Sequence, residues 1–402
     1  MTTIVDSNLP VARPSWDHSR LESRIVHLGC GAFHRAHQAL YTHHLLESTD
    51  SDWGICEVNL MPGNDRVLIE NLKKQQLLYT VAEKGAESTE LKIIGSMKEA
   101  LHPEIDGCEG ILNAMARPQT AIVSLTVTEK GYCADAASGQ LDLNNPLIKH
   151  DLENPTAPKS AIGYIVEALR LRREKGLKAF TVMSCDNVRE NGHVAKVAVL
   201  GLAQARDPQL AAWIEENVTF PCTMVDRIVP AATPETLQEI ADQLGVYDPC
   251  AIACEPFRQW VIEDNFVNGR PDWDKVGAQF VADVVPFEMM KLRMLNGSHS
   301  FLAYLGYLGG YETIADTMTN PDYRKAAFAL MMQEQAPTLS MPEGTDLNAY
   351  ATLLIERFSN PSLRHRTWQI AMDGSQKLPQ RLLDPVRLHL QNGGSWRHLA
   401  LG

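Results

Sequence analysis

The stretch that decides the fold is Ile25-Val26-His27-Leu28-Gly29-Cys30-Gly31-Ala32-Phe33-His34-Arg35-Ala36-His37. A short apolar run leads into two closely spaced glycines, and a helical sequence follows over residues 38–47. Strand, glycine turn and helix in this order are the context that a dinucleotide-binding site needs. Gly29 permits a tight turn, and Gly31 lets a pyrophosphate approach backbone N–H groups at the start of the helix. We therefore expect residues 25–36 to bind a dinucleotide, although His34 stands where the usual pattern has a third glycine.

Apolar runs and helical stretches alternate along the first two thirds of the chain. Short apolar runs rich in β-branched residues cover residues 55–60, 121–125, 180–183 and the segment reaching 225, and helical stretches cover 162–175 and 193–205. This alternation predicts βαβ units and a largely parallel sheet. From about residue 286 the strand signals fade, and 325–335 and 347–358 have helical patterns. The sequence thus predicts a Rossmann-type α/β domain over residues 1–285 and a mostly α-helical substrate and catalytic domain over 286–402.

Composition excludes several classes of protein. The 402 residues carry a formal net charge of −12 and no long Lys/Arg run, which argues against a nucleic-acid partner. The first residues do not have the pattern of a secretory signal, and no apolar run reaches the roughly 18 residues that span a bilayer. The eight cysteines are scattered, with no Cys-x-x-Cys pair. We expect a cytoplasmic protein with reduced, mostly buried thiols and a small-molecule ligand, either a monomer or a small homo-oligomer.

A second informative stretch is Glu288-Met-Met-Lys291-Leu-Arg-Met-Leu-Asn296-Gly-Ser-His299. At about 100° per residue on an α-helix, the polar groups Glu288, Asn296 and His299 fall on the same side as Lys291. Apolar residues occupy the opposite side, which a core would bury: Phe287, Met290, Met294 and Leu305. Burial disfavours the charged form of a lysine, so a lysine among apolar neighbours can act as a general base. The simpler alternative is a surface lysine beside a core-facing histidine.

Two features near the glycine turn leave alternatives open. Glu57 lies inside the second expected strand, and Asp65 follows it at more than the usual spacing of about 20 residues from the glycines. An acid at this place favours NAD, whereas the adjacent Arg66 can tolerate a 2′-phosphate; we expect NAD.

Several histidines follow the turn and suggest zinc, at positions 34, 37, 43 and 44. Because no companion Cys or Asp cluster and no His-Glu-x-x-His motif accompanies them, we expect helix-face and loop histidines and no metal.

Four motifs occur in order along the chain: the glycine turn, Ser124-Leu-Thr-Val-Thr-Glu129-Lys-Gly-Tyr132, Ser184-Cys-Asp-Asn187 and Lys291-x4-Asn296-x2-His299. Together they resemble the polyol-specific long-chain dehydrogenases, the mannitol dehydrogenase family, over essentially the whole chain. The resemblance implies an oxidoreductase that uses NAD and no metal to interconvert a secondary alcohol and a ketone. It is strongest to members that interconvert D-mannonate and D-fructuronate in hexuronate catabolism. Mannitol 2-dehydrogenase, or another polyol or aldonate dehydrogenase such as a tagaturonate reductase or arabinitol dehydrogenase, is the alternative.

The resemblance also implies roles for individual residues. Lys291 matches the family's general base, and Asn187 and Asn296 match the amides that hold the reacting oxygen. The resemblance matches three further residues to catalytic or substrate contacts: His299, Asp226 and Lys377. It matches two acids, Glu288 and Glu129, to the route by which the base exchanges protons with solvent. Where mannitol-type enzymes carry an arginine, this chain has Gln369, with Arg364 and Arg366 just upstream. We expect Arg366 to contact the substrate, and this change favours a charged substrate over an uncharged polyol.

The end of the chain and two other classes of function complete the expectations. The chain stops at Leu399-Ala-Leu-Gly402, and because exposed ends are normally polar, this apolar stop predicts a helical domain that is truncated. A Schiff-base aldolase with Lys291 as the nucleophile is a second class, but it leaves the glycine turn unexplained. A non-catalytic nucleotide-sensing module is a third class. In such a module the pattern of Lys291, Asn296 and His299 would have no catalytic role.

Overall fold

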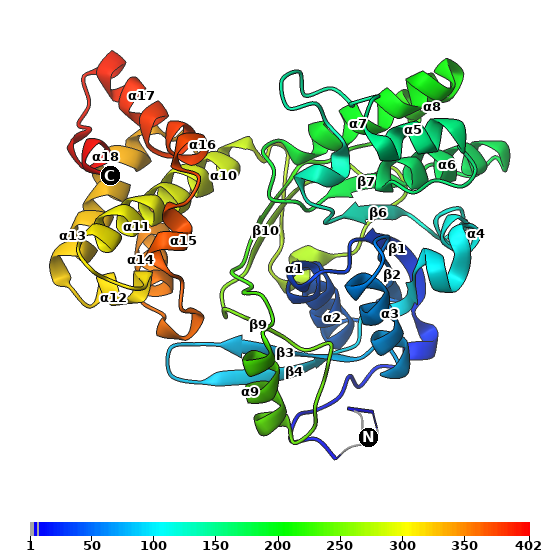
Figure 1. Ribbon diagram of the computed structural model, residues 1–402, viewed down its shortest axis with the longest axis horizontal. Helices are drawn as coiled ribbons and strands as arrows, with labels where there is room; N and C mark the ends of the chain where they lie inside the picture. Colours follow the sequence, from blue (N-terminus) through cyan, green and yellow to red (C-terminus); the bar gives the residue numbers. More distant parts are fainter. Residues whose placement is uncertain (1–3, 6–7) are drawn as a thin grey trace. The chain divides into compact units, whose positions relative to one another are not determined.

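The computed structural model describes residues 4–5 and 8–402 and divides into two compact units. The first unit runs to Glu83 and includes Glu90–Ala282, and the second combines Lys84–Thr89 with Asp283–Gly402. Figure 1 shows sheets in the first unit and helices throughout the second. The predicted fold class, a Rossmann-type sheet domain followed by a helical domain, is confirmed.

The first unit is built on a five-stranded parallel sheet. In spatial order its strands are β5 (Met97–Leu101), β2 (Trp53–Val58), β1 (Glu22–Leu28), β6 (Ile122–Leu125) and β7 (Thr181–Ser184). β1 is central, and the chain adds strands first on one side of it and then on the other. This is the doubly wound arrangement, in which ligands bind beyond the carboxyl ends of the strands at the point where the order reverses. Here that point lies between β1 and β6.

Helices and short helical turns connect the strands of the first unit. The helices are α1 (Ala32–Ala36), α2 (Gln38–Ser48), α3 (Asn64–Lys74), α4 (Pro103–Met115), α5 (Pro146–Glu153), α6 (Ala161–Glu174), α7 (Asn191–Arg206), α8 (Pro208–Asn217) and α9 (Pro234–Leu244), and the turns are η1 (His18–Arg20), η2 (Glu129–Tyr132) and η3 (Trp273–Val276). The stretches expected to be helical at 38–47, 162–175 and 193–205 coincide with α2, α6 and α7 within a few residues.

Both faces of the parallel sheet are buried, which explains why its strands have continuous apolar sequences. Val26 and Val123 belong to the core cluster that includes α4, α6 and α7, whereas their neighbours Ile25 and Ile122 belong to a cluster on the other face with Tyr41 and two tryptophans. All four strand residues have 0% exposure. Burying each such side chain contributes about 1.5–3 kcal/mol, so the strands are held by both layers at once.

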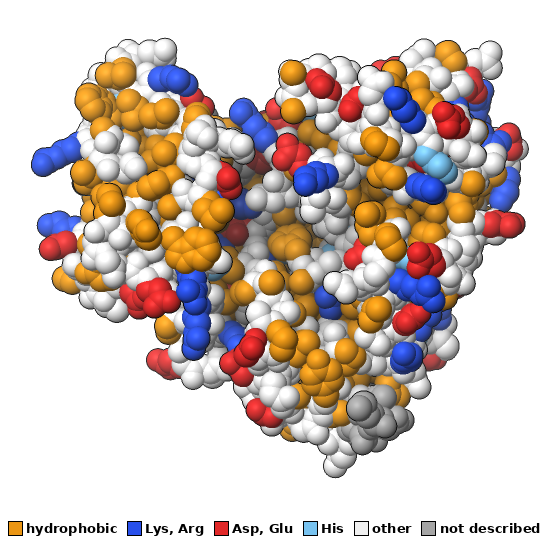
Figure 2. Space-filling model, in the orientation of Figure 1, with side chains coloured by type: hydrophobic (Ala, Val, Ile, Leu, Met, Phe, Trp, Pro, Cys, Tyr) orange, Lys and Arg blue, Asp and Glu red, His pale blue; other side chains and the backbone are white. Residues whose placement is uncertain are grey.

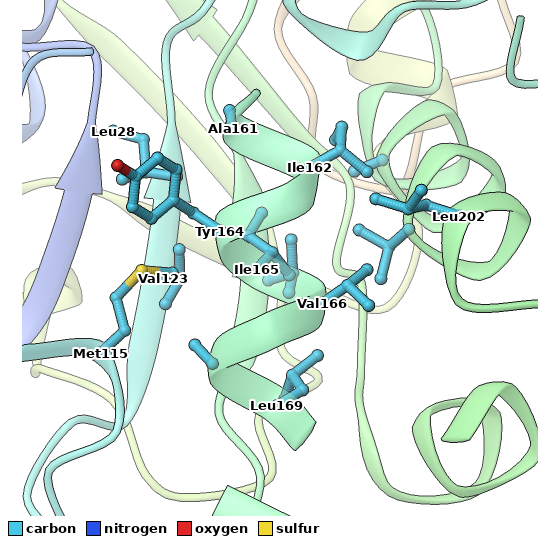
Figure 3. Packing of buried hydrophobic residues seen from close by; sticks show 14 of the residues in the cluster. Leu28, Met115, Val123, Ala161, Ile162, Tyr164, Ile165, Val166, Leu169 and Leu202 are labelled. Atoms are coloured by element: carbon cyan, nitrogen blue, oxygen red, sulfur yellow. The ribbon is translucent and has the colours of Figure 1, made fainter. Parts of the chain in front are cut away.

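Helix α6 shows how one helix joins these layers (Figure 3). It begins after Ser160, whose Oγ accepts a hydrogen bond from the N–H of Gly163 at 2.9 Å, a favourable N-cap. Tyr164 points toward the sheet beside Leu28, while Ile162 and Val166 point toward Leu202 of α7 (Figure 3). Because two sides of α6 are apolar, it packs against the sheet and α7 simultaneously.

Two smaller sheets complete the first unit. In one, β8 (Thr223–Asp226) pairs antiparallel with β10 (Gln259–Glu263), which pairs parallel with β11 (Gln279–Val281). In the other, β3 (Tyr79–Lys84) lies between β4 (Thr89–Ile94) and β9 (Ile252–Cys254). The apolar run reaching Val225 is therefore a strand, as expected, but it lies outside the parallel sheet.

The second unit consists of helices and helical turns. They are α10 (Val285–Met290), η4 (Lys291–Gly297), α11 (Ser298–Leu308), α12 (Ile314–Met318), α13 (Pro321–Ala329), η5 (Leu330–Gln335), η6 (Ala336–Thr338), α14 (Leu347–Phe358), η7 (Pro361–Leu363), α15 (Thr367–Ala371), α16 (Gly374–Leu378), η8 (Pro379–Leu383), α17 (Asp384–Asn392) and α18 (Arg397–Leu401). The expected helices at 325–335 and 347–358 are present.

Three of these turns, η4, η5 and η8, are π-helical and interrupt longer helices. η4 packs against both η5 and η8. The regular α-helix assumed above for residues 288–299 is therefore wrong, because the wider π turn changes the angle between successive side chains. Leu295, which α-helical geometry places beside Lys291, is 6% exposed and belongs to the buried side. π turns often occur at functional sites.

The second unit also contains the tip of the β3–β4 hairpin, residues 84–89. Asn360 Nδ2 donates to the carbonyl oxygen of Lys84 at 3.0 Å, and Ser362 Oγ donates to that of Gly85 at 2.8 Å. A segment more than 190 positions before Asp283 in the sequence is thus part of the helical unit.

The surface and the thiols agree with the composition. None of the eight cysteines forms a disulfide, and seven of them are buried, as expected. Acidic and basic side chains are interspersed on the face drawn in Figure 2, which has no single extended basic patch. Of the helices in the described residues, none combines the length and apolar character needed to cross a membrane.

Candidate active site

A pocket of about 280 Å³ lies at the glycine turn after β1. Gly29 and Gly31 line it, together with Asn59 from the β2–α3 connection and Asp65 from the start of α3. Gly29 has φ +103°, and a Cβ there would lie 2.1 Å from the carbonyl oxygen of Thr126, so only glycine fits this turn. A Cβ on Gly31 would meet nothing closer than 4.0 Å, which leaves its backbone open to a ligand. Exposed turn backbone and a nearby acid fit the pyrophosphate and ribose of a dinucleotide.

Asp65 lies in the first turn of α3 and is half-buried. Burial raises the pKa of its carboxyl above the ordinary value. The adjacent Arg66 is engaged elsewhere, because its guanidinium lies 3.0 Å from Glu70 and 3.2 Å from Glu104. The pocket wall thus contains an acidic side chain, while the neighbouring cation already has acidic partners.

The rest of the 25–36 stretch is distributed between core and helix. The side chains of the strand residues and of two later positions are buried in core clusters: Ile25, Val26, Leu28, Cys30 and Ala36. Residues 32–36 form α1, in which Phe33 stacks on His37 at 4.9 Å and the Arg35 guanidinium bonds the carbonyl oxygen of Cys250. Within this stretch, Gly29 and Gly31 line the pocket. The side chains of the other described positions in this stretch are not among the residues that line it.

His27, His34 and Glu57 form a buried cluster behind the glycine turn. Their potential metal-ligand atoms lie within 4.8 Å of one another. However, the imidazole rings of His27 and His34 stack at 3.4 Å with an angle of 11°, so their in-plane lone pairs run side by side and do not converge on one point. His27 also has both nitrogens occupied, by Ser124 Oγ at 2.7 Å and Thr126 Oγ1 at 2.8 Å. This geometry favours a hydrogen-bonded cluster over a metal site.

Burial disfavours charge on the side chains of this cluster. His34 Nε2 lies 2.7 Å from a carboxylate oxygen of Glu57, and both side chains have 0% exposure. Burial lowers the pKa of His34 to about 3 and raises the pKa of Glu57 to about 7. His34, which stands where a third glycine would be, therefore pairs with Glu57 in the core. Asp65 is then the acid that lines the pocket.

Three of the expected residues lie at or just after the carboxyl ends of strands in the first unit. Glu129 begins η2 after β6, Asn187 follows β7, and Asp226 is the last residue of β8. Glu129 and Asn187 are exposed, whereas Asp226 is 4% exposed. The next residue, Arg227, is buried and bonds the carbonyl oxygen of Ala36 at 2.6 Å, which links the end of β8 to the turn region.

The other expected residues lie in the second unit. Lys291 is the first residue of the π turn η4, Asn296 is its sixth, and His299 lies in the first turn of α11. These three side chains and Glu288 are half-buried. The His299 ring stacks on Phe358 at 5.4 Å with an angle of 7°.

Basic groups gather around His299. Its ring lies 5.3 Å from that of His365, and Arg381 Nη1 donates to Oγ of the adjacent Ser300 at 3.0 Å. The pKa of His299 lies well below its usual range because burial removes water, and because His365, Arg381, Arg357 and Lys377 oppose a further positive charge. The largest electrostatic contributions to this shift therefore all come from basic side chains.

Arg381 was not singled out in the sequence. Its Nε is buried and has no hydrogen-bond partner in the part of the chain that the structure describes, and burial lowers the pKa of its guanidinium. The only available signal was its position one helical turn beyond Lys377. A largely buried guanidinium beside a neutral imidazole is suited to an anionic group, which would complete its hydrogen bonds.

Lys377 and Arg366 occupy different surroundings. Lys377 Nζ donates to the carbonyl oxygen of Met372 at 2.7 Å and is partly exposed. Arg366 is exposed, and its guanidinium lies 3.5 Å from the carboxylate of Glu312. Arg366 thus already has an acidic partner, whereas Arg381 lies beside the residue after His299.

Comparisons with known proteins cover both units. The family model described as the mannitol dehydrogenase Rossmann domain matches residues 23–275, and that of the mannitol dehydrogenase C-terminal domain matches residues 283–402. The chain is 58% identical, over 100% of its length and 82% of the relative, to the uncharacterized oxidoreductase YeiQ of Escherichia coli strain K12.

Two solved structures are also similar to this chain. A D-sorbitol dehydrogenase in substrate-free form has a TM-score of 0.95 and 39% identity, covering 100% of this chain and 83% of that one. The mannitol 2-dehydrogenase of Pseudomonas fluorescens, in a ternary complex with NAD and D-mannitol, has a TM-score of 0.86 and 41% identity, covering 98% and 80%.

Proposed function

The chain belongs to the mannitol dehydrogenase family of oxidoreductases that act on CH–OH groups, and we propose that it interconverts D-mannonate and D-fructuronate with NAD. The observation that carries the choice of substrate is the group of basic side chains around His299, which includes Arg381 beside Ser300. A sugar acid offers a carboxylate to these groups, and an uncharged hexitol does not. We further propose residues 1–285 as the NAD-binding domain and 286–402 as the substrate domain.

The choice of NAD rests on the pocket at the glycine turn. Gly31 leaves the backbone accessible, and Asp65 can accept hydrogen bonds from ribose hydroxyls. The 2′-phosphate of NADP would be repelled by this carboxylate, and Arg66 is already paired with Glu70 and Glu104. When bound, the nicotinamide ring of the dinucleotide accepts or returns a hydride. The Pseudomonas fluorescens relative, solved with NAD, supports the same choice.

The chain's own residues supply the proton chemistry in this proposal. Lys291 takes the proton from the substrate hydroxyl during oxidation and returns it during reduction. Asn187 and Asn296 are neutral donors, so they stabilise negative charge on the reacting oxygen without changing protonation state. Asp226, His299 and the cations Lys377, Arg366 and Arg381 hold the substrate. Glu288 and Glu129 line the route by which Lys291 exchanges its proton with solvent.

A comparison of two ketoses tests the substrate. With NADH, D-fructuronate should have a much higher kcat/KM than D-fructose, because a charge-assisted bond to a carboxylate contributes about 1.5–3 kcal/mol, roughly tenfold to a hundredfold. Arg381→Met should reduce this preference by about the same factor through the loss of one such bond. Arg387→Met is the matched control, since Arg387 is exposed and lies 2.7 Å from Asp384.

The main alternative is mannitol 2-dehydrogenase, which similarity to the Pseudomonas fluorescens enzyme favours; the similar D-sorbitol dehydrogenase likewise acts on an uncharged hexitol. If the protein is a mannitol 2-dehydrogenase, its kcat/KM for fructose should equal or exceed that for fructuronate. Arg381→Met should then leave the ratio of the two kcat/KM values unchanged. That result would replace the sugar-acid proposal. Trapping of a covalent adduct with borohydride would instead indicate the Schiff-base aldolase, and binding of NADH without turnover of any ketose would indicate the nucleotide-sensing module.

A further inference from the structure

One buried carboxylate connects two of the motifs that the sequence contains. Asp186, 7% exposed, immediately precedes Asn187 after β7. Its Oδ1 accepts a hydrogen bond from the N–H of Thr128 at 2.8 Å, and its Oδ2 accepts one from the N–H of Val127 at 3.1 Å and one from the hydroxyl of Tyr132 at 2.5 Å. The loop from Thr126 to Tyr132, which carries Glu129, is thus bonded to the turn that carries Asn187.

The loop bonded by Asp186 is conformationally strained. Thr128 has φ +62° and ψ 170°, a region that a β-branched residue rarely adopts, and it directly precedes Glu129. Such strain persists only where the surrounding structure fixes the backbone. The bond from Thr128 N–H to Asp186 is one such constraint, because it involves the strained residue itself.

A second anchor fixes the turn from the other side. Asn191, which is fully buried, donates from Nδ2 to the carbonyl oxygen of Asp186 at 3.0 Å and to that of Thr223 at 2.9 Å. The N–H of Thr223 donates back to Asn191 Oδ1 at 2.9 Å. Thr223 begins β8, which ends at Asp226. A continuous hydrogen-bonded network therefore runs through the segments that carry Glu129, Asn187 and Asp226.

We infer that Asp186 is a positioning residue: its carboxylate fixes the strained Thr128–Glu129 backbone against the turn that presents Asn187. The inference rests on the proposed function, in which Asn187 holds the reacting oxygen. Asp186 accepts three hydrogen bonds, and an asparagine at this position has one acceptor oxygen, so it would leave a backbone N–H unsatisfied.

The test is Asp186→Asn, with Asp248→Asn as the matched control. Asp248 is also buried and also accepts three hydrogen bonds, from Gln75 Nε2 and from the N–H groups of Thr80 and Cys250. These partners follow α3, lie in β3 and precede β9, so these bonds are made outside the segments that carry Glu129, Asn187 and Asp226. Both variants should lose similar stability in urea unfolding. Only Asp186→Asn should lower kcat, by about 10- to 100-fold, while KM for NADH changes little.

A double-mutant cycle shows whether Asp186 acts through Asn187. In an Asn187→Ala background, Asp186→Asn should reduce kcat by less than about threefold, because the group that it positions is already absent. Equal fold losses in both backgrounds would overturn the inference. So would an equal loss of kcat in Asp248→Asn, since that would make the effect one of general stability.

Hydrogen exchange separates this inference from the proposed function. The amides of residues 126–132 and 185–190 should exchange faster in Asp186→Asn than in the wild type or in Asp248→Asn, whatever the substrate. If the wild type turns over no polyol or sugar acid with NAD, the proposed function fails, and exchange alone then decides the positioning role. Unchanged protection of both loops in Asp186→Asn would overturn it.

Discussion

At the scale of single residues, Lys291 has the most direct role in the proposed chemistry. It is half-buried at the start of a π turn, where the chain also presents Asn296. Replacing Lys291 by alanine should lower kcat by at least the 10²–10⁴-fold typical of lost acid–base catalysis. The NADH dissociation constant, measured by fluorescence titration, should hardly change, because the cofactor pocket is lined by residues of the first unit.

An added primary amine provides the complementary measurement for Lys291→Ala. Small alkylamines should restore part of the lost turnover, with a pH dependence that follows the pKa of the amine. Near-normal turnover in Lys291→Ala without any amine would remove this lysine from the mechanism.

At the scale of elements, the π turn η4 depends on a glycine. Gly297 has ordinary helical dihedral angles, but a Cβ there would lie 2.3 Å from Gln335 Nε2 and 3.0 Å from the carbonyl oxygen of Arg381. Gly297→Ala should therefore destabilise the second unit by about 1–3 kcal/mol through overpacking, although alanine is the better helix former. It should also lower kcat, because the strain falls between Asn296 and Ser298.

Gly110→Ala is the control for this prediction. Gly110 lies in α4, and a Cβ there would be 3.5 Å from Asp106 Cβ, an ordinary contact. This substitution should raise the free energy of unfolding by about 0.5–1 kcal/mol and leave kcat unchanged. Urea unfolding of the two variants measures the difference in their stability. If Gly297→Ala stabilised the protein as much as Gly110→Ala does, η5 and η8 would have to shift around η4 at little cost, and the prediction would be wrong.

The same elements show what a sequence can and cannot predict. Strands of the parallel sheet were predictable because both faces are buried, so that Ile25 and Val26 are both apolar. β9 and β11 have only three residues each and carry no such signal. The π turns also escaped prediction, because the packing of η4 against η5 and η8 involves segments that are far apart in the chain. Arg381 was missed for the same reason, since its proximity to Ser300 is a tertiary contact.

At the scale of the whole molecule, buried neutral histidines should make the protein sensitive to acid. Burial lowers the pKa of His34, His37 and His43 to about 3, from an ordinary value of 6.5. Below pH 6.5 these histidines bind protons in the unfolded chain but stay neutral in the folded chain. The free energy of unfolding therefore falls as pH decreases, by up to about 1.4 kcal/mol per pH unit for each histidine. Glu57, with its pKa raised to about 7, acts in the opposite direction between pH 4.5 and 7.

Urea unfolding at pH 7.5, 6.5, 5.5 and 4.5 measures this effect. The midpoint should fall steeply below pH 6.5, and His43→Gln should make the decline shallower. His193→Gln, a substitution of a histidine that is exposed in α7, should leave the decline as it is. A wild-type midpoint that stays constant down to pH 5 would contradict the prediction.

The hairpin tip at residues 84–89 limits how this protein can be divided or recombined. A gene fragment encoding residues 283–402 would lack the strand connection whose carbonyl groups accept hydrogen bonds from Asn360 and Ser362. Conversely, a fragment ending at residue 282 would carry that connection with no helices to pack against. The helical unit is therefore not an autonomous module. Chimeras that exchange it between relatives, in a search for new substrates, should transfer the hairpin tip along with it.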